Sequence, residues 1–163
     1  MFIYILNTLL NFMETFKMPD RIKSILLVTL QFIFILLLLI RSRLNELWLV
    51  PAIFISLSGL LVVWAIATMQ KSKLRILPEP SAGAILITDG PYHFIRHPMY
   101  TSILLGTSGL LINHFNRIRL GFFIALALVL IIKLTWEEKM LLQKFGRYKI
   151  YMANTSRLFP FLF

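Results

Sequence analysis

The sequence contains no cysteine, which excludes disulfide bonds, thiolate nucleophiles and metal sites built on cysteine. Charged residues make up only 15% of the chain, whereas soluble domains carry about a quarter. The sequence also lacks a phosphate-binding glycine loop, a dinucleotide-binding fingerprint and a Ser-His-Asp order. Its three histidines have no metal-ligand spacing with the carboxylates, so we expect no metal site.

Apolar residues dominate what is present. They make up 58% of the 163 residues, and the mean hydropathy is +0.80. A single domain of this size cannot bury so much apolar surface in its own core, so a lipid bilayer must cover part of it. The net charge of +10 lies at the ends of apolar runs and forms no basic stripe with interleaved aromatics, so we expect no nucleic-acid partner.

The apolar runs predict an all-α integral membrane protein with about four transmembrane helices. Each run is long enough, or nearly so, to cross a bilayer at about 1.5 Å per residue. The predicted helices are Ile22–Ile40, Leu47–Met69, Pro98–Asn113 and Leu120–Gly146. The run from Pro98 is short, and its Gly106 and Gly109 would allow close approach of a neighbouring helix. We expect a single domain over residues 1–163, with an interfacial segment 1–21, a helical hairpin 22–69 and a C-terminal part 70–163.

The distribution of lysine and arginine predicts the orientation. Twelve of them lie in the N-terminal segment, in the long polar connection Gln70–His97 and in the C-terminal part after Trp136. The two opposite loops hold four, including Arg117 and Arg119. Cytoplasmic loops carry the excess of positive charge. We therefore expect both termini and the polar connection on the cytoplasmic side of an inner or cytoplasmic membrane.

The stretch "RHPMY" combines a helix start with groups that can bind an anion. Pro98 suits the first position of a helix, which places His97 at the N-cap, Arg96 before it and Tyr100 in the first turn. A helix N-terminus with added Arg and His favours a carboxylate or phosphate. The alternative is structural, with Arg96 and Tyr100 as anchors at the membrane boundary and His97 as a cap.

The stretch "WEEK" places adjacent carboxylates at the end of the most apolar helix. Lys133 and Glu137 are four residues apart and so share a helix face. Charged groups at this depth indicate either a polar notch opening into the membrane or, as the alternative, a first solvated turn in which lysines neutralise Glu137 and Glu138. Phe145 and Gly146 then predict a helix stop with glycine at the C′ position.

The order "RHPMY", an apolar stretch, "EE" and "FGRYKIY" resembles the isoprenylcysteine carboxyl methyltransferase family, whose hallmark is RHPxY, a hydrophobic region and EE. The related phospholipid methyltransferases share this arrangement. The resemblance covers roughly residues 71–160. It implies a membrane methyltransferase that uses S-adenosylmethionine, releases S-adenosylhomocysteine and acts on a lipophilic substrate, with the carboxylate of a prenylated cysteine favoured.

The resemblance also implies a cytoplasm-facing cofactor pocket between the 70–97 loop and the C-terminal segment. The implied cofactor-binding residues are Ala84, Ile85, Leu86, Ile87, Tyr92, His97, Pro98, Met99, Tyr100, Glu137 and Glu138. The implied catalytic residues are Arg96, His97, Tyr100 and Glu137. Lys133 stands where eukaryotic members carry an arginine for the substrate carboxylate, which implies a substrate-binding role. Of the two carboxylates, Glu137 is favoured for the cofactor.

Three other functions stay open. An amine acceptor must be neutral before it attacks, whereas a carboxylate needs no general base, and this mildly favours O-methylation over N-methylation of a phospholipid amine. A sterol-type membrane reductase using a nicotinamide cofactor and a non-catalytic four-helix membrane protein are the alternatives of other classes. The expected partners are the bilayer and a lipophilic or prenylated substrate, and the sequence does not indicate an oligomeric state.

Overall fold

The structure is a computed structural model that describes residues 19–40, 42, 46–70 and 86–160. Every regular element in these ranges is helical, which confirms the all-α class for the described part of the chain. The elements are α2 (Asp20–Ile40), α3 (Leu49–Met69), the 3-10 helix η2 (Gly90–His93), α4 (Pro98–Asn113), α5 (Arg117–Lys144) and α6 (Tyr148–Ala153). The predicted interfacial segment lies almost wholly outside the described residues.

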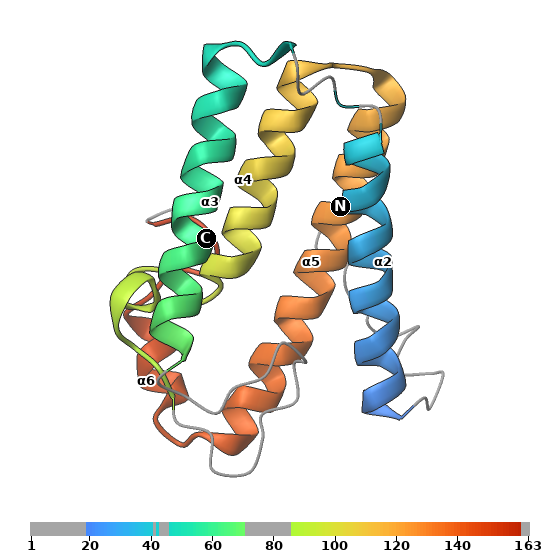
Figure 1. Ribbon diagram of the computed structural model, residues 1–163. Helices are drawn as coiled ribbons and strands as arrows, with labels where there is room; N and C mark the ends of the chain where they lie inside the picture. Colours follow the sequence, from blue (N-terminus) through green and yellow to red (C-terminus); the bar gives the residue numbers. More distant parts are fainter. Residues whose placement is uncertain (1–18, 41, 43–45, 71–85, 161–163) are drawn as a thin grey trace.

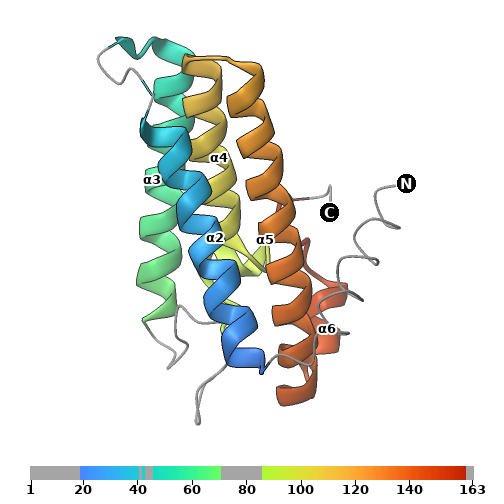
Figure 2. The same cartoon turned by 90° about the vertical axis from the view of Figure 1, so that its right-hand side faces the viewer.

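The four long helices stand side by side and alternate in direction, so that α2 and α4 run one way while α3 and α5 run the other (Figure 1). They pack most extensively as two pairs, α3 with α4 and α2 with α5. Figure 2 shows the bundle from the side on which α2 stands in front. This alternation gathers the start of α2, the end of α3, η2, the start of α4 and α6 at one end of the bundle (Figure 1). Most of the predicted site residues lie at that end.

Three of the described helices, α2, α3 and α5, are long and apolar enough to cross a membrane. Helix α4 has 16 residues. It therefore reaches about 24 Å at 1.5 Å per residue, less than the hydrocarbon thickness of about 30 Å. The prediction of membrane helices is thus confirmed for three by length and composition, and a fourth span stays a prediction.

The centre of the bundle is a leucine cluster on α5. Leu126, Leu130 and Leu134 recur every four residues, so they share one helix face, and all three are fully buried. They pack against Leu38 of α2 and Leu104 of α4 in one core cluster. The register of this apolar face decides where the next turns of α5 present their charged side chains.

Close packing of α3 against α4 confirms the prediction from the two glycines. A Cβ atom on Gly106 would lie 2.7 Å from Ser58 Oγ, and one on Gly109 would lie 3.0 Å from the carbonyl oxygen of Pro51. The Ser58 hydroxyl donates to the carbonyl of Ser102 at 2.7 Å. The missing side chains therefore let the helices approach until a hydroxyl of α3 reaches the backbone of α4.

Of two expectations about the ends of α5, one was wrong and one is confirmed. Arg119 was assigned to a loop, but α5 begins at Arg117 because the Asn116 side chain caps it, accepting from the Ile118 N–H. Arg119 is therefore inside the helix and buried, and its guanidinium donates to the carbonyls of Leu38, Leu110 and His114. At the other end α5 stops at Lys144 with Phe145 as the C-cap, so Gly146 occupies the predicted C′ position, although without the positive φ of a left-handed glycine.

Candidate active site

A cavity of about 120 Å³ opens at the end of the bundle where η2, the start of α4, the last turns of α5 and α6 meet. This volume is many times that needed for one water molecule. Ten of the predicted site residues line it: Leu86, Ile87, Tyr92, Arg96, His97, Pro98, Met99, Tyr100, Lys133 and Glu137. The predicted Ala84 and Ile85 lie outside the described residues, and Glu138 lies beside the cavity without lining it.

The start of α4 places His97 and Tyr100 toward α5. Pro98 occupies the first helical position and His97 the N-cap, as predicted, but the imidazole makes no capping hydrogen bond. Its Nδ1 lies 3.7 Å from Glu137 Oε2 and its Nε2 lies 3.5 Å from Glu138 Oε1, and its ring stacks on that of Tyr100. The alternative in which the side chain of His97 caps the helix is therefore wrong, because this imidazole sits between two carboxylates.

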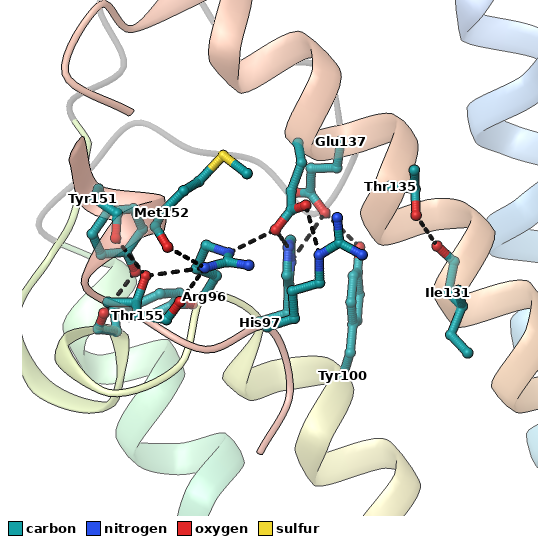
Figure 3. Close-up of polar contacts among 12 residues, drawn as sticks. Arg96, His97, Tyr100, Ile131, Thr135, Glu137, Tyr151, Met152 and Thr155 are labelled. Atoms are coloured by element: carbon teal, nitrogen blue, oxygen red, sulfur yellow. Dashed lines mark hydrogen bonds and ion pairs between the residues drawn. The ribbon is translucent and has the colours of Figure 1, made fainter. Parts of the chain in front are cut away.

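Glu137 is held by the first turn of α4. The Tyr100 hydroxyl donates to Glu137 Oε2 at 2.8 Å (Figure 3). The Glu137 side chain keeps 23% of its surface exposed, whereas that of Glu138 keeps 4%. Glu137 is therefore the carboxylate that can accept from a molecule in the cavity, with one oxygen fixed by a buried phenol.

Glu138 serves a different purpose from its neighbour. Arg96 Nε lies 2.7 Å and Arg157 Nε 3.1 Å from its two oxygens. Arg96 Nη1 also donates to the carbonyls of Met152 and Thr155 (Figure 3). The guanidinium of Arg96 thus ties α5 to the C-terminal segment, and its charge is already matched by a buried carboxylate.

The C-terminal segment pairs with the residues that precede α4. An isolated parallel bridge joins Ile95 to Ser156, and the Arg96 N–H donates to the Ser156 carbonyl at 2.8 Å. The Thr101 hydroxyl donates to the Leu158 carbonyl at 2.6 Å. The C-terminal tail is therefore built into the wall of the site.

Two tyrosines of this tail segment were missed by the sequence reasoning. Tyr148 and Tyr151 line the cavity, and the Tyr151 hydroxyl donates to the Tyr92 carbonyl at 2.6 Å. Burial, followed by the charge of Glu137, raises the pKa of Tyr92 to about 12, and burial also raises the pKa values of Tyr148 and Tyr151. All three phenols therefore stay protonated at neutral pH. For Tyr148 and Tyr151, the available sequence signal was their spacing in "YKIY".

Lys133 lies deeper than the carboxylates and is 2% exposed. Its ammonium donates to Gln31 Oε1 at 2.9 Å and stands 5.0 Å from the ring centroid of Tyr100. Lys133 and Glu137 both line the cavity, as the predicted polar notch requires. Gln31 was missed, although a single glutamine inside the apolar run Ile22–Ile40 could have indicated it.

A family model of phospholipid methyltransferases matches residues 47–148, which is more than half of the chain. The chain belongs to the phospholipid methyltransferase family. The match spans α3, η2, α4 and α5, so it includes His97, Tyr100, Lys133 and Glu137. No curated protein matches the chain.

Membership of the phospholipid methyltransferase family makes this a membrane protein of a methyltransferase family, and the expected resemblance is confirmed at that level. Among residues 19–40, 42, 46–70 and 86–160, no group of three or more His, Asp or Glu side chains could hold a metal ion. Helix α2 and almost all of the tail lie outside the family match, yet both contribute side chains to the cavity.

Proposed function

We propose that this protein is an S-adenosylmethionine-dependent methyltransferase that methylates a lipophilic substrate, with the carboxylate of a prenylated cysteine or a similar molecule as the favoured acceptor. One observation carries the proposal. A single cavity holds a tyrosine-bound carboxylate, Glu137, near its polar end and a buried ammonium, Lys133, at its deeper end. A cationic donor and an anionic acceptor can therefore be bound at two ends of one site.

The side chains present suit the proposed cofactor. Its positive charges match Glu137 and the faces of Tyr92, Tyr148 and Tyr151, because aromatic rings attract cations. Met69 and Met99 supply polarisable apolar contact. When bound, the cofactor would supply an electrophilic methyl group. Glu138 contributes indirectly, through its ion pair with Arg96. The remaining proposed contacts are Leu86, Ile87, Arg96, His97, Pro98, Tyr100 and the backbone near Ala84 and Ile85.

In such a reaction the protein aligns the two reactants and excludes water from the site. A carboxylate attacking a cation destroys charge, so a site with little water favours the transition state over the separated ions. Lys133 can hold the acceptor carboxylate, although its ammonium lacks the two-pronged geometry of an arginine. Tyr100 fixes the orientation of Glu137, and His97 lies between the two carboxylates.

The membrane arrangement belongs to the same proposal. We place the cavity on the cytoplasmic side, because it opens at the end of the bundle whose segments carry most of the lysines and arginines. Helix α4 then serves as the fourth, shorter span, shielded by α3 and α5. The cofactor enters from water, and the lipid substrate enters sideways from the bilayer, since moving its tail into water would cost about 0.8 kcal/mol per CH₂. The chain forms a single domain with its catalytic core in residues 70–163.

N-methylation of a phospholipid amine is the second candidate, and the family match favours it. An ammonium must lose a proton before it attacks. Glu137 faces the cavity, so it offers a proton acceptor for that step, and Lys133 could then bind the phosphate of the same lipid.

Methyl transfer from a radiolabelled donor separates these candidates. The purified protein in neutral detergent is given a farnesyl-cysteine analogue or phosphatidylethanolamine. We expect label in a base-labile ester of the first acceptor, and loss of that label in Lys133→Met. Label in the phospholipid alone would make N-methylation the function, and no label in either acceptor would contradict the proposed activity.

A further inference from the structure

Gln31 and Lys133 form a buried pair on the wall of the cavity. Both side chains line it, and they are 6% and 2% exposed. Gln31 belongs to α2, which lies outside the family match, whereas Lys133 lies within it. Gln31, which the family match does not cover, is therefore in contact with Lys133, which the match does cover.

The hydrogen bond between them fixes the orientation of the amide. An ammonium only donates hydrogen bonds, so Gln31 must offer its oxygen to Lys133, as the 2.9 Å distance from Nζ to Oε1 shows. The amide nitrogen of Gln31 then points elsewhere with its own donors. Lys133 has donors beyond the one that Gln31 accepts, and Tyr100 offers it only a ring face.

This wall of the cavity consequently presents donors from both partners. Burying an ammonium away from water is costly unless its charge is matched. Glu137 lies one turn along the same helix face and its charge acts on Lys133, but Tyr100, not Lys133, donates to its Oε2, and the hydrogen bond of Lys133 goes to Gln31. The group that best completes Gln31 and Lys133 is therefore an acceptor with negative charge.

We propose that Gln31 is a specificity-determining residue that, with Lys133, binds the anionic head group of the lipid substrate, a carboxylate or a phosphate. The proposal rests on the proposed function, and it assigns to α2 a role in choosing the substrate. Gln31 acts in two ways, by holding the Lys133 ammonium in place and by donating from its amide nitrogen to the same anion.

Three farnesyl-tailed probes that differ only in the head group test this: a carboxylate, a phosphate monoester and a neutral carboxamide. Their affinities are measured by equilibrium dialysis against the full-length protein in neutral detergent. We expect the wild type to bind at least one anionic probe about tenfold more tightly than the carboxamide, as expected for a charge-assisted hydrogen bond. A tighter carboxylate supports a prenylcysteine-like substrate, and a tighter phosphate supports a phospholipid.

The variant Gln31→Glu keeps the shape of the side chain but replaces the amide N–H donors with a carboxylate, which repels an anionic head group. It should weaken the anionic probes by about tenfold or more while leaving the carboxamide unchanged. Gln31→Leu, which removes the amide without adding charge, should give an intermediate loss. Thr29→Val is the matched control, because Thr29 lies on α2 with its hydroxyl bonded to its own helix at the Ile25 carbonyl.

A merely structural role for Gln31 would weaken all three probes equally, and that result would overturn the proposal. Equal binding of the anionic and neutral probes by the wild type, or no binding of any anionic probe, would also overturn it. Binding of S-adenosylhomocysteine by the same preparations shows whether this inference alone fails or the proposed function fails with it. If the wild type binds it but does not discriminate head groups, only this inference fails; if it does not bind, the proposed function fails.

Discussion

Tyr100 in the first turn of α4 and Glu137 near the end of α5 are joined by a 2.8 Å hydrogen bond from the phenol to the carboxylate. The bond links two segments 37 residues apart in sequence. It leaves Glu137 partly exposed to the cavity while the phenol is buried. The geometry of this pair therefore decides where a negative charge stands in the proposed cofactor site.

Removing the phenol tests that link. Tyr100→Phe keeps the ring that stacks on His97 and faces Lys133 but loses the donor to Glu137. We expect the affinity for S-adenosylhomocysteine to fall about tenfold, and stability to fall by less than about 1 kcal/mol because the carboxylate can be hydrated. Isothermal calorimetry and thermal unfolding measure the two quantities. Unchanged affinity would show that the pair does not position the cofactor.

The adjacent carboxylates should respond in opposite ways to the same change. Glu137→Gln should abolish most cofactor binding with little loss of stability, because this side chain faces the cavity. Glu138→Gln should instead lower the free energy of unfolding by about 3–5 kcal/mol, since it leaves the buried Arg96 without its anion. Each variant controls for the other. Equal losses of stability in both would contradict the division of roles.

Much of the fold follows from local signals. Pro98 fixes the start of α4, and the structure gives this helix the predicted bounds, Pro98–Asn113. The apolar runs predicted α2 and α3 to within two residues at each end. These features depend on a proline at a helix start and on contiguous apolar side chains, and both can be read in a sequence.

The parts of the site that the sequence did not indicate depend on contacts between distant segments. Arg157 pairs with Glu138 only because the tail lies beside the residues before α4. Gln31 reaches Lys133 across 102 residues. Outside the site, Arg119 was taken for a loop residue because nothing local shows that three carbonyls at the ends of α2 and α4 converge on it. The sequence indicates such a contact only through a lone polar residue within an apolar run, such as Gln31.

Close packing of α3 and α4 predicts a difference between glycines. In Gly109→Ala the new Cβ would stand 3.0 Å from the Pro51 carbonyl oxygen, a backbone atom that cannot move aside easily. We expect a loss of about 1–3 kcal/mol, in the range of overpacking in a protein core. Gly121→Ala is the matched control, because nothing lies within 4 Å of its added atom. Thermal unfolding in detergent compares them, and equal melting temperatures would contradict the packing.

The raised pKa of Tyr92 predicts a dependence on alkaline pH. In the unfolded chain a tyrosine ionises near pH 10, whereas burial and Glu137 raise the pKa of Tyr92 to about 12 in the folded protein. Between these values the unfolded state binds fewer protons, so stability is full below pH 10 and falls as the pH rises to 12. Denaturant unfolding of the wild type and Tyr92→Phe should show a smaller decline in the variant. Identical pH profiles would refute the buried environment.

The central claim is that the cavity between α4, α5 and the tail binds S-adenosylmethionine, and the most direct measurement is calorimetric titration of the detergent-purified protein with S-adenosylhomocysteine, alongside NADPH. The account predicts saturable binding of S-adenosylhomocysteine that is lost in both His97→Ala and Glu137→Gln and retained in Thr29→Val, with no binding of NADPH. Binding of NADPH in its place, or wild-type affinity for S-adenosylhomocysteine in both site variants, would contradict it.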